Sequence, residues 1–145
     1  MDLCDWHERR VSMATDVAAQ CPPQGAATAG GLKGERLART RIKLHRFIHG
    51  APMYEDFDLR QLNKMNEVWE IKVPGTRKQQ VRLIGWFLAR NHFFATHIVR
   101  RYKLGDRYDQ SWVQAIQRCI RRRVEQFVDM PIYRGHVFSE YVTND

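Results

Sequence analysis

The segment QVRLIGWFLA, residues 80–89, constrains the fold more than any other part of this chain. It is apolar on both of its alternating faces except at Arg82, as is typical of an inner strand that is covered on both sides of a sheet. The preceding segment VWEIKV, residues 68–73, alternates with a period of two, so its apolar side chains share one face. The chain therefore contains a sheet that other elements must cover on both faces.

A further strand is predicted at FFATHIVRRYK, residues 93–103, after a turn at residues 90–93. The short connections between these segments predict an antiparallel meander. The polar positions around the first two strands carry mostly charge, and they are Glu70, Lys72, Arg77, Lys78 and Arg82. This concentration of cations on a small sheet indicates a surface that holds a phosphate chain.

Two amphipathic helices flank the predicted meander. The first spans residues 35–50, and the second begins near Ser111, which forms a capping box with Gln114, and ends before Asp129 and Pro131. The apolar stripes predicted to face the core are Leu37, Leu44 and Ile48, widened by Ala38, Ile42 and Phe47, in the first helix, and Val113, Ile116, Ile120, Val124 and Phe127 in the second.

The remaining segments predict one domain with two extensions. Residues 1–34 hold a possible first strand at residues 8–17 and a Pro/Gly-rich loop at residues 20–34. Residues 35–128 form the folded domain, and residues 129–145 form a tail that can add a short strand. The predicted class is α+β, with a small twisted antiparallel sheet packed against N-terminal helices and followed by a C-terminal helix.

The 145 residues include 24 Lys and Arg against 16 Asp and Glu, which gives a net charge of +8 and favours polyanionic partners. Nucleic acid, an acidic protein and an anionic membrane surface are all compatible with that charge. No apolar run is long enough to span a bilayer, and the N-terminus lacks the apolar core of a secretory signal. Three widely spaced cysteines without metal-binding spacing fit a cytoplasmic protein that needs no metal or cofactor.

Several basic residues are candidates for contact with phosphate. Arg82 is the sharpest, because a cation in an apolar strand is costly unless it is paired, and an ion pair with Glu70 is the structural alternative. The others lie on the neighbouring strands, where a solvated strand end is the alternative, and they are Lys72, Arg100, Arg101 and Lys103.

Aromatic and histidine side chains near the basic run offer further chemistry. Tyr102, Tyr108 and Trp112 can stack on exposed bases, although an aromatic residue at a helix start is more often part of the core. His97 can act as a general acid or base near neutral pH, or it can be a structural histidine. His45 and His49 lie one helical turn apart, but no third ligand accompanies them.

Five short motifs in this order resemble the RelE/ParE superfamily of small bacterial toxins, and most closely its HigB-like, phage-derived branch. The resemblance covers roughly residues 35–125 and depends on the order of the motifs more than on any one of them. The matching positions are Leu62, then Trp69, Glu70 and Lys72, then residues 80–83, then residues 94–101, and finally Val113, Ala115 and Arg118.

The resemblance implies a toxin of a type II toxin–antitoxin system that cuts mRNA at the ribosome without a metal. In such enzymes the ribose 2′-OH attacks the adjacent phosphate and leaves a cyclic phosphate. Carried over to this chain, Arg82 and Arg101 would stabilise the charged phosphate, and His97 or Tyr108 would move the proton. The implied RNA-binding residues are Lys72, Arg100, Lys103, Trp112 and Arg118, and the implied partners are an antitoxin, in a hetero-oligomer, and the mRNA on the ribosome.

Two other functions are compatible with the same motifs. Val81 stands where the family usually has Tyr, and Tyr102 stands where it usually has the second Lys of a basic pair. These differences favour a ParE-like inhibitor of a topoisomerase as the first alternative. The extended termini favour the second, a non-catalytic phage or mobile-element module that binds nucleic acid or protein.

Overall fold

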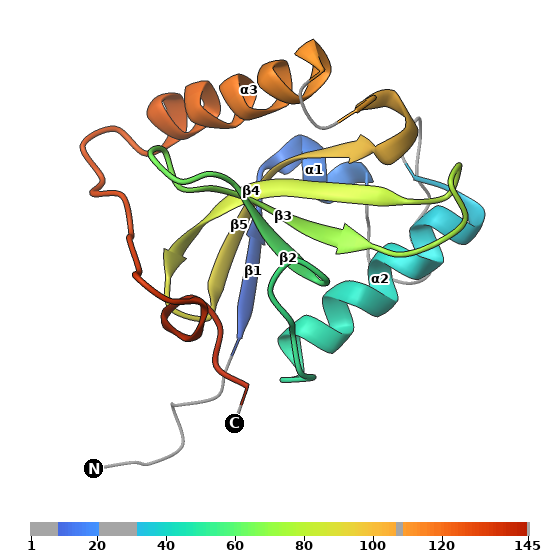
Figure 1. Cartoon of the computed structure of the whole chain (residues 1–145), viewed down its shortest axis with the longest axis horizontal. Helices are drawn as coiled ribbons and strands as arrows, with labels where there is room; N and C mark the ends of the chain where they lie inside the picture. Colours follow the sequence, from blue (N-terminus) through green and yellow to red (C-terminus); the bar gives the residue numbers. More distant parts are fainter. Residues whose placement is uncertain (1–8, 21–31, 107–108, 145) are drawn as a thin grey trace.

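The computed structural model describes residues 9–20, 32–106 and 109–144, and in this part of the chain it forms one five-stranded sheet with three helices (Figure 1). The α+β class is thereby confirmed. The strands are β1 (Arg10–Met13), β2 (Leu59–Asn63), β3 (Val68–Val73), β4 (Val81–Ala89) and β5 (His92–Arg100). The helices are α1 (Thr15–Gln20), α2 (Gly34–Ile48) and α3 (Gln110–Gln126).

The sheet order is β1-β5-β4-β3-β2, so the apolar strand β4 lies in the middle, as its sequence predicts. The pairs formed by β2, β3, β4 and β5 are antiparallel, which matches the expected meander. The first strand is also present, but β1 pairs with β5 in parallel, and the sheet is therefore mixed. A parallel neighbour requires a long crossover, and here α1 and α2 lie between β1 and the meander.

Strand β2 lies between residues 50 and 68, where the sequence pattern predicts neither a helix nor a strand. It pairs with β3 at one edge of the sheet, and a register shift occurs between Gln61 and Asn63. Of its residues, only Leu59 is buried. A short edge strand with one buried side chain has almost no periodic signal, and this explains why the pattern misses it.

Helix α2 begins and ends close to the predicted bounds, but it buries only part of the predicted stripe, Leu44 and Phe47, with Leu37 packed beside them. Its buried residues are Thr40, Lys43, Leu44 and Phe47. Ile42 and Ile48, which the apolar stripe places in the core, are 60% and 41% exposed. A buried Thr and a buried Lys cannot be read from apolar periodicity, because each of them depends on a partner elsewhere in the fold.

Helix α3 also confirms its predicted stripe only in part, since Ile116, Ile120 and Phe127 pack against the core. Its buried residues are Trp112, Ala115, Cys119 and Arg123, whereas the predicted core residues Val113 and Val124 are 40% and 63% exposed. The N-cap is Asp109, whose carboxylate accepts a hydrogen bond from the Ser111 backbone N–H at 3.1 Å. The predicted capping box at Ser111 is therefore wrong by two residues.

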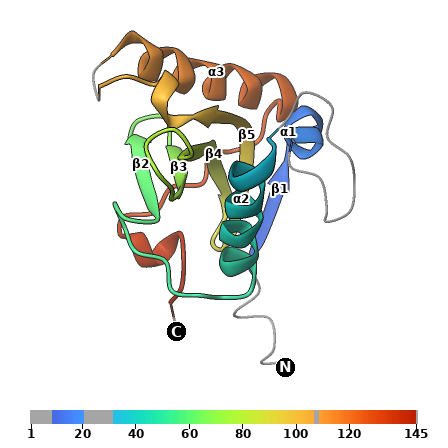
Figure 2. The same ribbon diagram turned by 90° about the vertical axis from the view of Figure 1, so that its right-hand side faces the viewer.

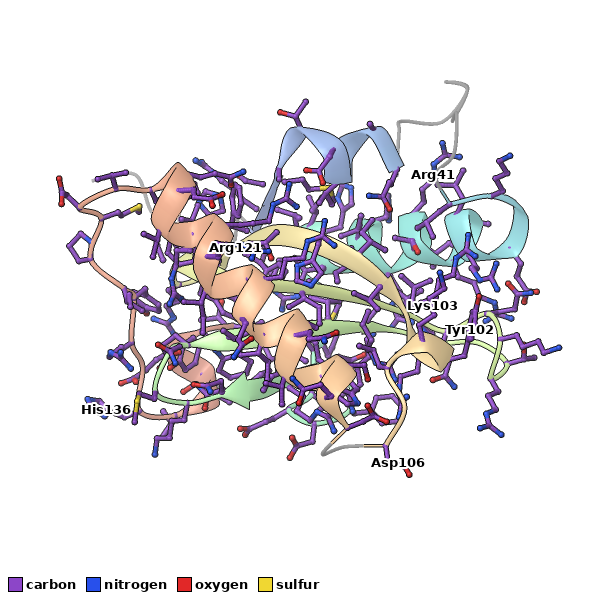
Figure 3. The ribbon with its side chains drawn as sticks, turned by 90° about the horizontal axis from the view of Figure 1, so that it is seen from above. Arg41, Tyr102, Lys103, Asp106, Arg121 and His136 are labelled. Atoms are coloured by element: carbon purple, nitrogen blue, oxygen red, sulfur yellow. The ribbon has the colours of Figure 1, made fainter. Side chains whose placement is uncertain are left out.

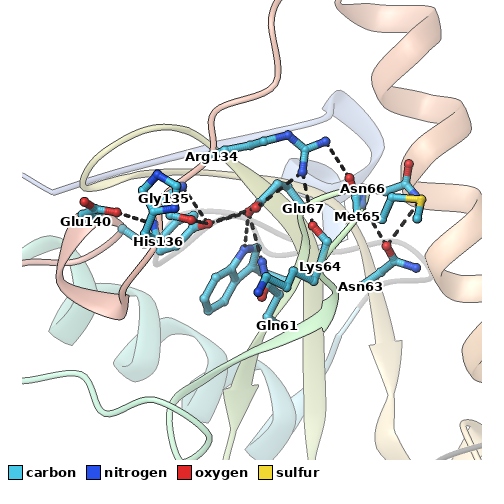
Figure 4. Close-up of polar contacts among 12 residues, drawn as sticks. Gln61, Asn63, Lys64, Met65, Asn66, Glu67, Arg134, Gly135, His136 and Glu140 are labelled. Atoms are coloured by element: carbon cyan, nitrogen blue, oxygen red, sulfur yellow. Dashed lines mark hydrogen bonds and ion pairs between the residues drawn. The ribbon is translucent and has the colours of Figure 1, made fainter.

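The C-terminal tail forms no strand in its described part, residues 129–144. It packs instead on the sheet through Tyr141, whose ring contacts Trp69 and Phe87 with centroids 4.5 and 5.4 Å away. The Tyr141 hydroxyl donates to the buried Glu67 carboxylate at 2.8 Å, and Arg134 holds the turn that precedes Glu67 by donating to the Met65 carbonyl (Figure 4).

The helices cover the sheet from two sides, with α3 along one side and α2 along the other (Figures 1 and 2). The largest fully buried side chains, which include Trp69, Trp86, Phe47, Phe87 and Phe93, fill the space between these layers. Among the described helices, none is long and apolar enough to cross a membrane.

Candidate functional site

A basic trough lies at the end of the sheet where β5 stops. It consists of two adjoining clefts with volumes of about 510 and 210 Å³. Arg77 and Tyr102 line both clefts, which makes the trough continuous. Its full lining is Arg36, Arg77, Lys78, Gln80, Arg101, Tyr102, Gly105 and Asp106, so four cations face one carboxylate.

Three separate parts of the chain build this trough. Arg101 and Tyr102 belong to a single 3₁₀ turn directly after β5, and the following loop brings Asp106 to the same end of the molecule (Figure 3). Arg77 and Lys78 come from the loop between β3 and β4. Arg36 on α2 ties these parts together, because its Nε and Nη2 donate to the Lys78 carbonyl at 3.0 and 2.6 Å.

Tyr102 is the exposed aromatic residue of the trough, with 45% of its surface accessible. The Arg36 guanidinium lies 6.0 Å from the centroid of its ring. A hydrogen bond from Arg100 is the main cause that lowers the pKa of the Tyr102 hydroxyl, and Lys103 lowers it further. The ring is therefore surrounded by cations but remains open to solvent.

Beside the trough lies a buried charge cluster centred on Glu70. The Glu70 carboxylate is fully buried, and it pairs with Arg60 Nε at 2.9 Å and Arg82 Nε at 3.4 Å. Burial raises the pKa of Glu70, and the nearby cations Arg60 and Arg82 oppose that rise. The ion pair that the sequence offers as the alternative role of Arg82 is thus present.

Arg82 is also partly accessible from a cleft at the surface. It is 8% exposed, and it lines a cleft that adjoins the trough through Gln80. Its Nη2 donates to Gln80 Oε1 at 3.3 Å, and Arg101 is close enough to lower the pKa of Arg82 by repulsion, although burial lowers it more. Arg82 and Arg101 are therefore neighbours on one side of the sheet.

Trp112 packs between two of these guanidinium groups. The Cζ atoms of Arg60 and Arg101 lie 5.3 and 5.4 Å from its ring centroid, and Trp112 itself is only 3% exposed. Trp112 is therefore part of the core, which is the structural alternative named above. A buried ring beside these guanidinium groups holds Arg101 in place and is not accessible to a base.

The two residues that the resemblance implies would move the proton are His97 and Tyr108. His97 is 2% exposed, and burial together with Arg118 and Arg122 lowers its pKa to about 3. It is therefore neutral at pH 7 and lies beneath α3, away from the lining of the trough. Tyr108 falls outside the described residues.

The remaining predicted RNA-binding residues fall into separate places. Lys72 lines the same adjoining cleft as Arg82, and Lys103 is exposed beside Tyr102. Arg100 pairs in register with Val81, which places it on the opposite face of the sheet from Arg82. Arg118 is on α3 near His97 and Asp16, and it does not line the trough.

The adjoining cleft, which we name the Phe57 pocket, has a volume of about 300 Å³. Phe57 stands in the loop before β2, and it is 78% exposed. Sequence reasoning misses this residue and Arg36. The one available signal for Phe57 is an aromatic residue between two aspartates in a polar loop.

Within the described residues, no group of three or more His, Cys, Asp or Glu side chains is arranged to hold a metal ion. No protein-family model matches the sequence, no curated protein matches it, and no solved structure matches the chain.

Proposed function

We propose that this chain binds single-stranded RNA in the basic trough. The observation that carries the proposal is the exposed Tyr102 ring in a continuous cleft with four cations, Arg36, Arg77, Lys78 and Arg101. Cations that follow a strand of phosphates, together with an aromatic ring for an unstacked base, are the two elements of single-strand recognition. The resemblance to mRNA-cutting toxins supports RNA as the nucleic acid.

The exposed ring favours a single strand over other polyanions. A duplex keeps its bases stacked internally, so it would use the cations but not Tyr102. An acidic peptide or an anionic membrane would likewise leave the ring without a stacking partner. Two of the cations are held in place before a ligand arrives, because Arg36 donates twice to the Lys78 carbonyl and Arg101 donates to the Gly105 carbonyl at 2.9 Å.

Binding is tested with a fluorescently labelled RNA strand of about 12 nucleotides, a length within the usual site size. We expect Tyr102→Ala to weaken binding roughly 5- to 150-fold with an unchanged salt dependence, because a stacking contact is lost. Arg77→Ala is expected to reduce the slope of log affinity against log salt by about 0.7, because one phosphate contact is lost.

Arg121→Ala is the matched control, since Arg121 is exposed on α3 away from Tyr102 and Lys103 (Figure 3). It removes the same charge without touching the trough. A wild-type protein that does not bind RNA at low salt, or an Arg77→Ala variant that behaves like Arg121→Ala, would refute the proposal.

The neighbouring positions of Arg82 and Arg101 favour a second candidate function, cleavage of the bound strand by a toxin with an antitoxin partner. The 2′-OH would attack the adjacent phosphate, the bond to the 5′ oxygen would break, and a cyclic phosphate and a 5′-OH would result. Arg101 would stabilise the negative charge that develops on the phosphate. An acidic antitoxin segment would neutralise the trough in the inactive hetero-oligomer.

Induction of the protein in growing cells tests this second function. Growth arrest with cyclic-phosphate ends on mRNA, lost in Arg101→Ala and kept in Arg121→Ala, is the expected result. Arg101 is preferred to Arg82 for this test, because removal of Arg82 also breaks the buried pair with Glu70. Arrest with intact mRNA and DNA-damage signalling would instead support the topoisomerase inhibitor.

A further inference from the structure

The Phe57 pocket opens beside the basic trough and shares one wall with it. Gln80 lines both, so a strand lying in the trough reaches the Phe57 pocket without leaving the surface. Its other lining residues are Phe57, Pro74 and Gly75, together with two carboxylates and three cations, which are Asp56, Asp58, Lys43, Lys72 and Arg82.

The turn that carries Phe57 is held by buried contacts on both sides. Asp58 forms a buried ion pair with Lys43, and its carboxylate accepts from the Tyr54 backbone N–H at 2.8 Å. The Asp58 carbonyl accepts from the Lys72 backbone N–H at 2.8 Å, which ties the turn to β3.

The residue before Phe57 is fixed as well. The Asp56 backbone N–H donates to the Leu59 carbonyl at 2.7 Å, and the Asp56 carbonyl accepts from Lys72 Nζ at 2.5 Å. Asp56 also adopts the left-handed backbone region, with φ of 64°. Phe57, which is 78% exposed, is thus carried at a fixed place on the surface by a constrained turn.

The chemistry of the Phe57 pocket fits a nucleobase better than a phosphate. Its three cations stand beside the carboxylates of Asp56 and Asp58, which reduce the attraction for an anion. These cations already have partners, since Lys43 pairs with Asp58, Lys72 donates to the Asp56 carbonyl, and Arg82 pairs with Glu70. The surfaces that remain available to a ligand are the face of the Phe57 ring and the apolar surface of Pro74.

We propose that the Phe57 pocket is a second stacking subsite, which takes an unpaired nucleobase of the strand whose phosphates lie in the basic trough. This inference depends on the proposed RNA binding. Because the ring faces supply the contact and the polar groups are already paired, the subsite accepts any of the four bases with little preference.

The test compares Phe57→Ala, Phe57→Trp and a matched control on the same labelled RNA. Phe57→Ala is expected to weaken binding roughly 5- to 150-fold without changing the salt dependence, whereas Phe57→Trp preserves the affinity. Met65→Ala is the control, because Met65 is 77% exposed and lies in the turn between β2 and β3.

A strand with abasic sugars in place of its nucleosides separates stacking from phosphate contact. We expect the loss caused by Phe57→Ala to disappear on this strand, since no base remains to stack. If wild type binds RNA with the expected salt dependence but Phe57→Ala matches Met65→Ala, the subsite is refuted and the proposed function stands. An equal loss on normal and abasic strands also refutes the subsite, and no RNA binding at all refutes both.

Discussion

Glu70 and His97 are both buried on the side of the sheet that α3 covers, but they differ in the charged groups around them. Glu70 has two guanidinium partners, Arg60 and Arg82, within 3.4 Å. His97 has a hydrogen bond with Thr96 at 3.0 Å through Nδ1, and the charged groups nearest to it are mostly cations. The two guanidinium groups therefore oppose the rise that burial causes in the pKa of Glu70, whereas the surroundings of His97 keep its imidazole neutral.

We predict that His97 makes the protein less stable in mild acid. Its pKa is about 3 in the folded state against 6.5 for an ordinary histidine, so below pH 6.5 the unfolded chain binds a proton that the folded chain does not. Stability is thus complete above pH 6.5 and falls towards pH 3, with a loss of roughly 2 kcal/mol at pH 5. Asp16, which opposes this shift, is outweighed by burial, Arg118 and Arg122.

The measurement is the free energy of unfolding of wild type and His97→Gln between pH 7 and pH 5. Gln does not titrate, so the variant is expected to lose less stability than wild type over this range. His136→Gln serves as the control, because His136 is exposed. Parallel curves for wild type and His97→Gln would contradict the prediction.

Some features of the helices and strands could be predicted from the sequence, and others could not. The apolar strand β4 and the alternating β3 predict the sheet, because their periodicity is a direct consequence of burial. The bounds of both helices are close to the predicted ones, but only part of each predicted stripe packs in the core. In α3 the buried Arg123 packs over Trp86 at 5.2 Å and donates to the Asn66 carbonyl, and such partners come from distant sequence.

The residues of the candidate site also differ in whether the sequence could predict them. Lys72, Arg82 and Arg101 could be predicted as neighbours, because adjacent strands bring their side chains together. Arg36 could not, since it reaches the trough only through the packing of α2 against the loop between β3 and β4. Phe57 could not either, because nothing in the sequence shows that its turn is anchored by Lys43 and Lys72.

The cap of α3 provides a test at the scale of an element. Asp109→Ala removes the carboxylate that accepts from the Ser111 backbone N–H, and we expect a loss of about 1 kcal/mol in the free energy of unfolding. Asp109→Asn keeps an acceptor at this position, so its loss is expected to be only a few tenths of a kcal/mol. Equal losses in denaturant titrations of the two variants would contradict the stabilising role of the side-chain acceptor at this position.

Across the whole molecule, polar clamps join parts of the chain that are distant in sequence. Arg9 is buried and donates to the carbonyls of Ala51 and Thr143, each at 2.6 Å. Asn144 holds both the backbone N–H and the carbonyl of Met53, at 2.9 and 2.6 Å. The described tail is thus part of the fold, and it supports the turn that leads into β2.

Tyr141→Phe tests how much this tail contributes. The Tyr141 hydroxyl donates to Glu67, which is 3% exposed, so its removal leaves a buried carboxylate with fewer donors. We expect a loss of roughly 1–3 kcal/mol in the free energy of unfolding. Tyr54→Phe removes the same atom from a side chain that is 61% exposed, and it is expected to change stability by less than about 0.5 kcal/mol.

The parallel pairing of β1 with β5 has a consequence for biosynthesis. Arg10 pairs with His92, so the first strand leaves the exit tunnel long before its neighbour is translated. The side chain of Asn91 gains its partner later still, because it forms hydrogen bonds with Thr143, near the other end of the described chain. A nascent chain therefore carries β1 without its sheet partner until β5 has left the ribosome, which requires that the whole meander has been translated.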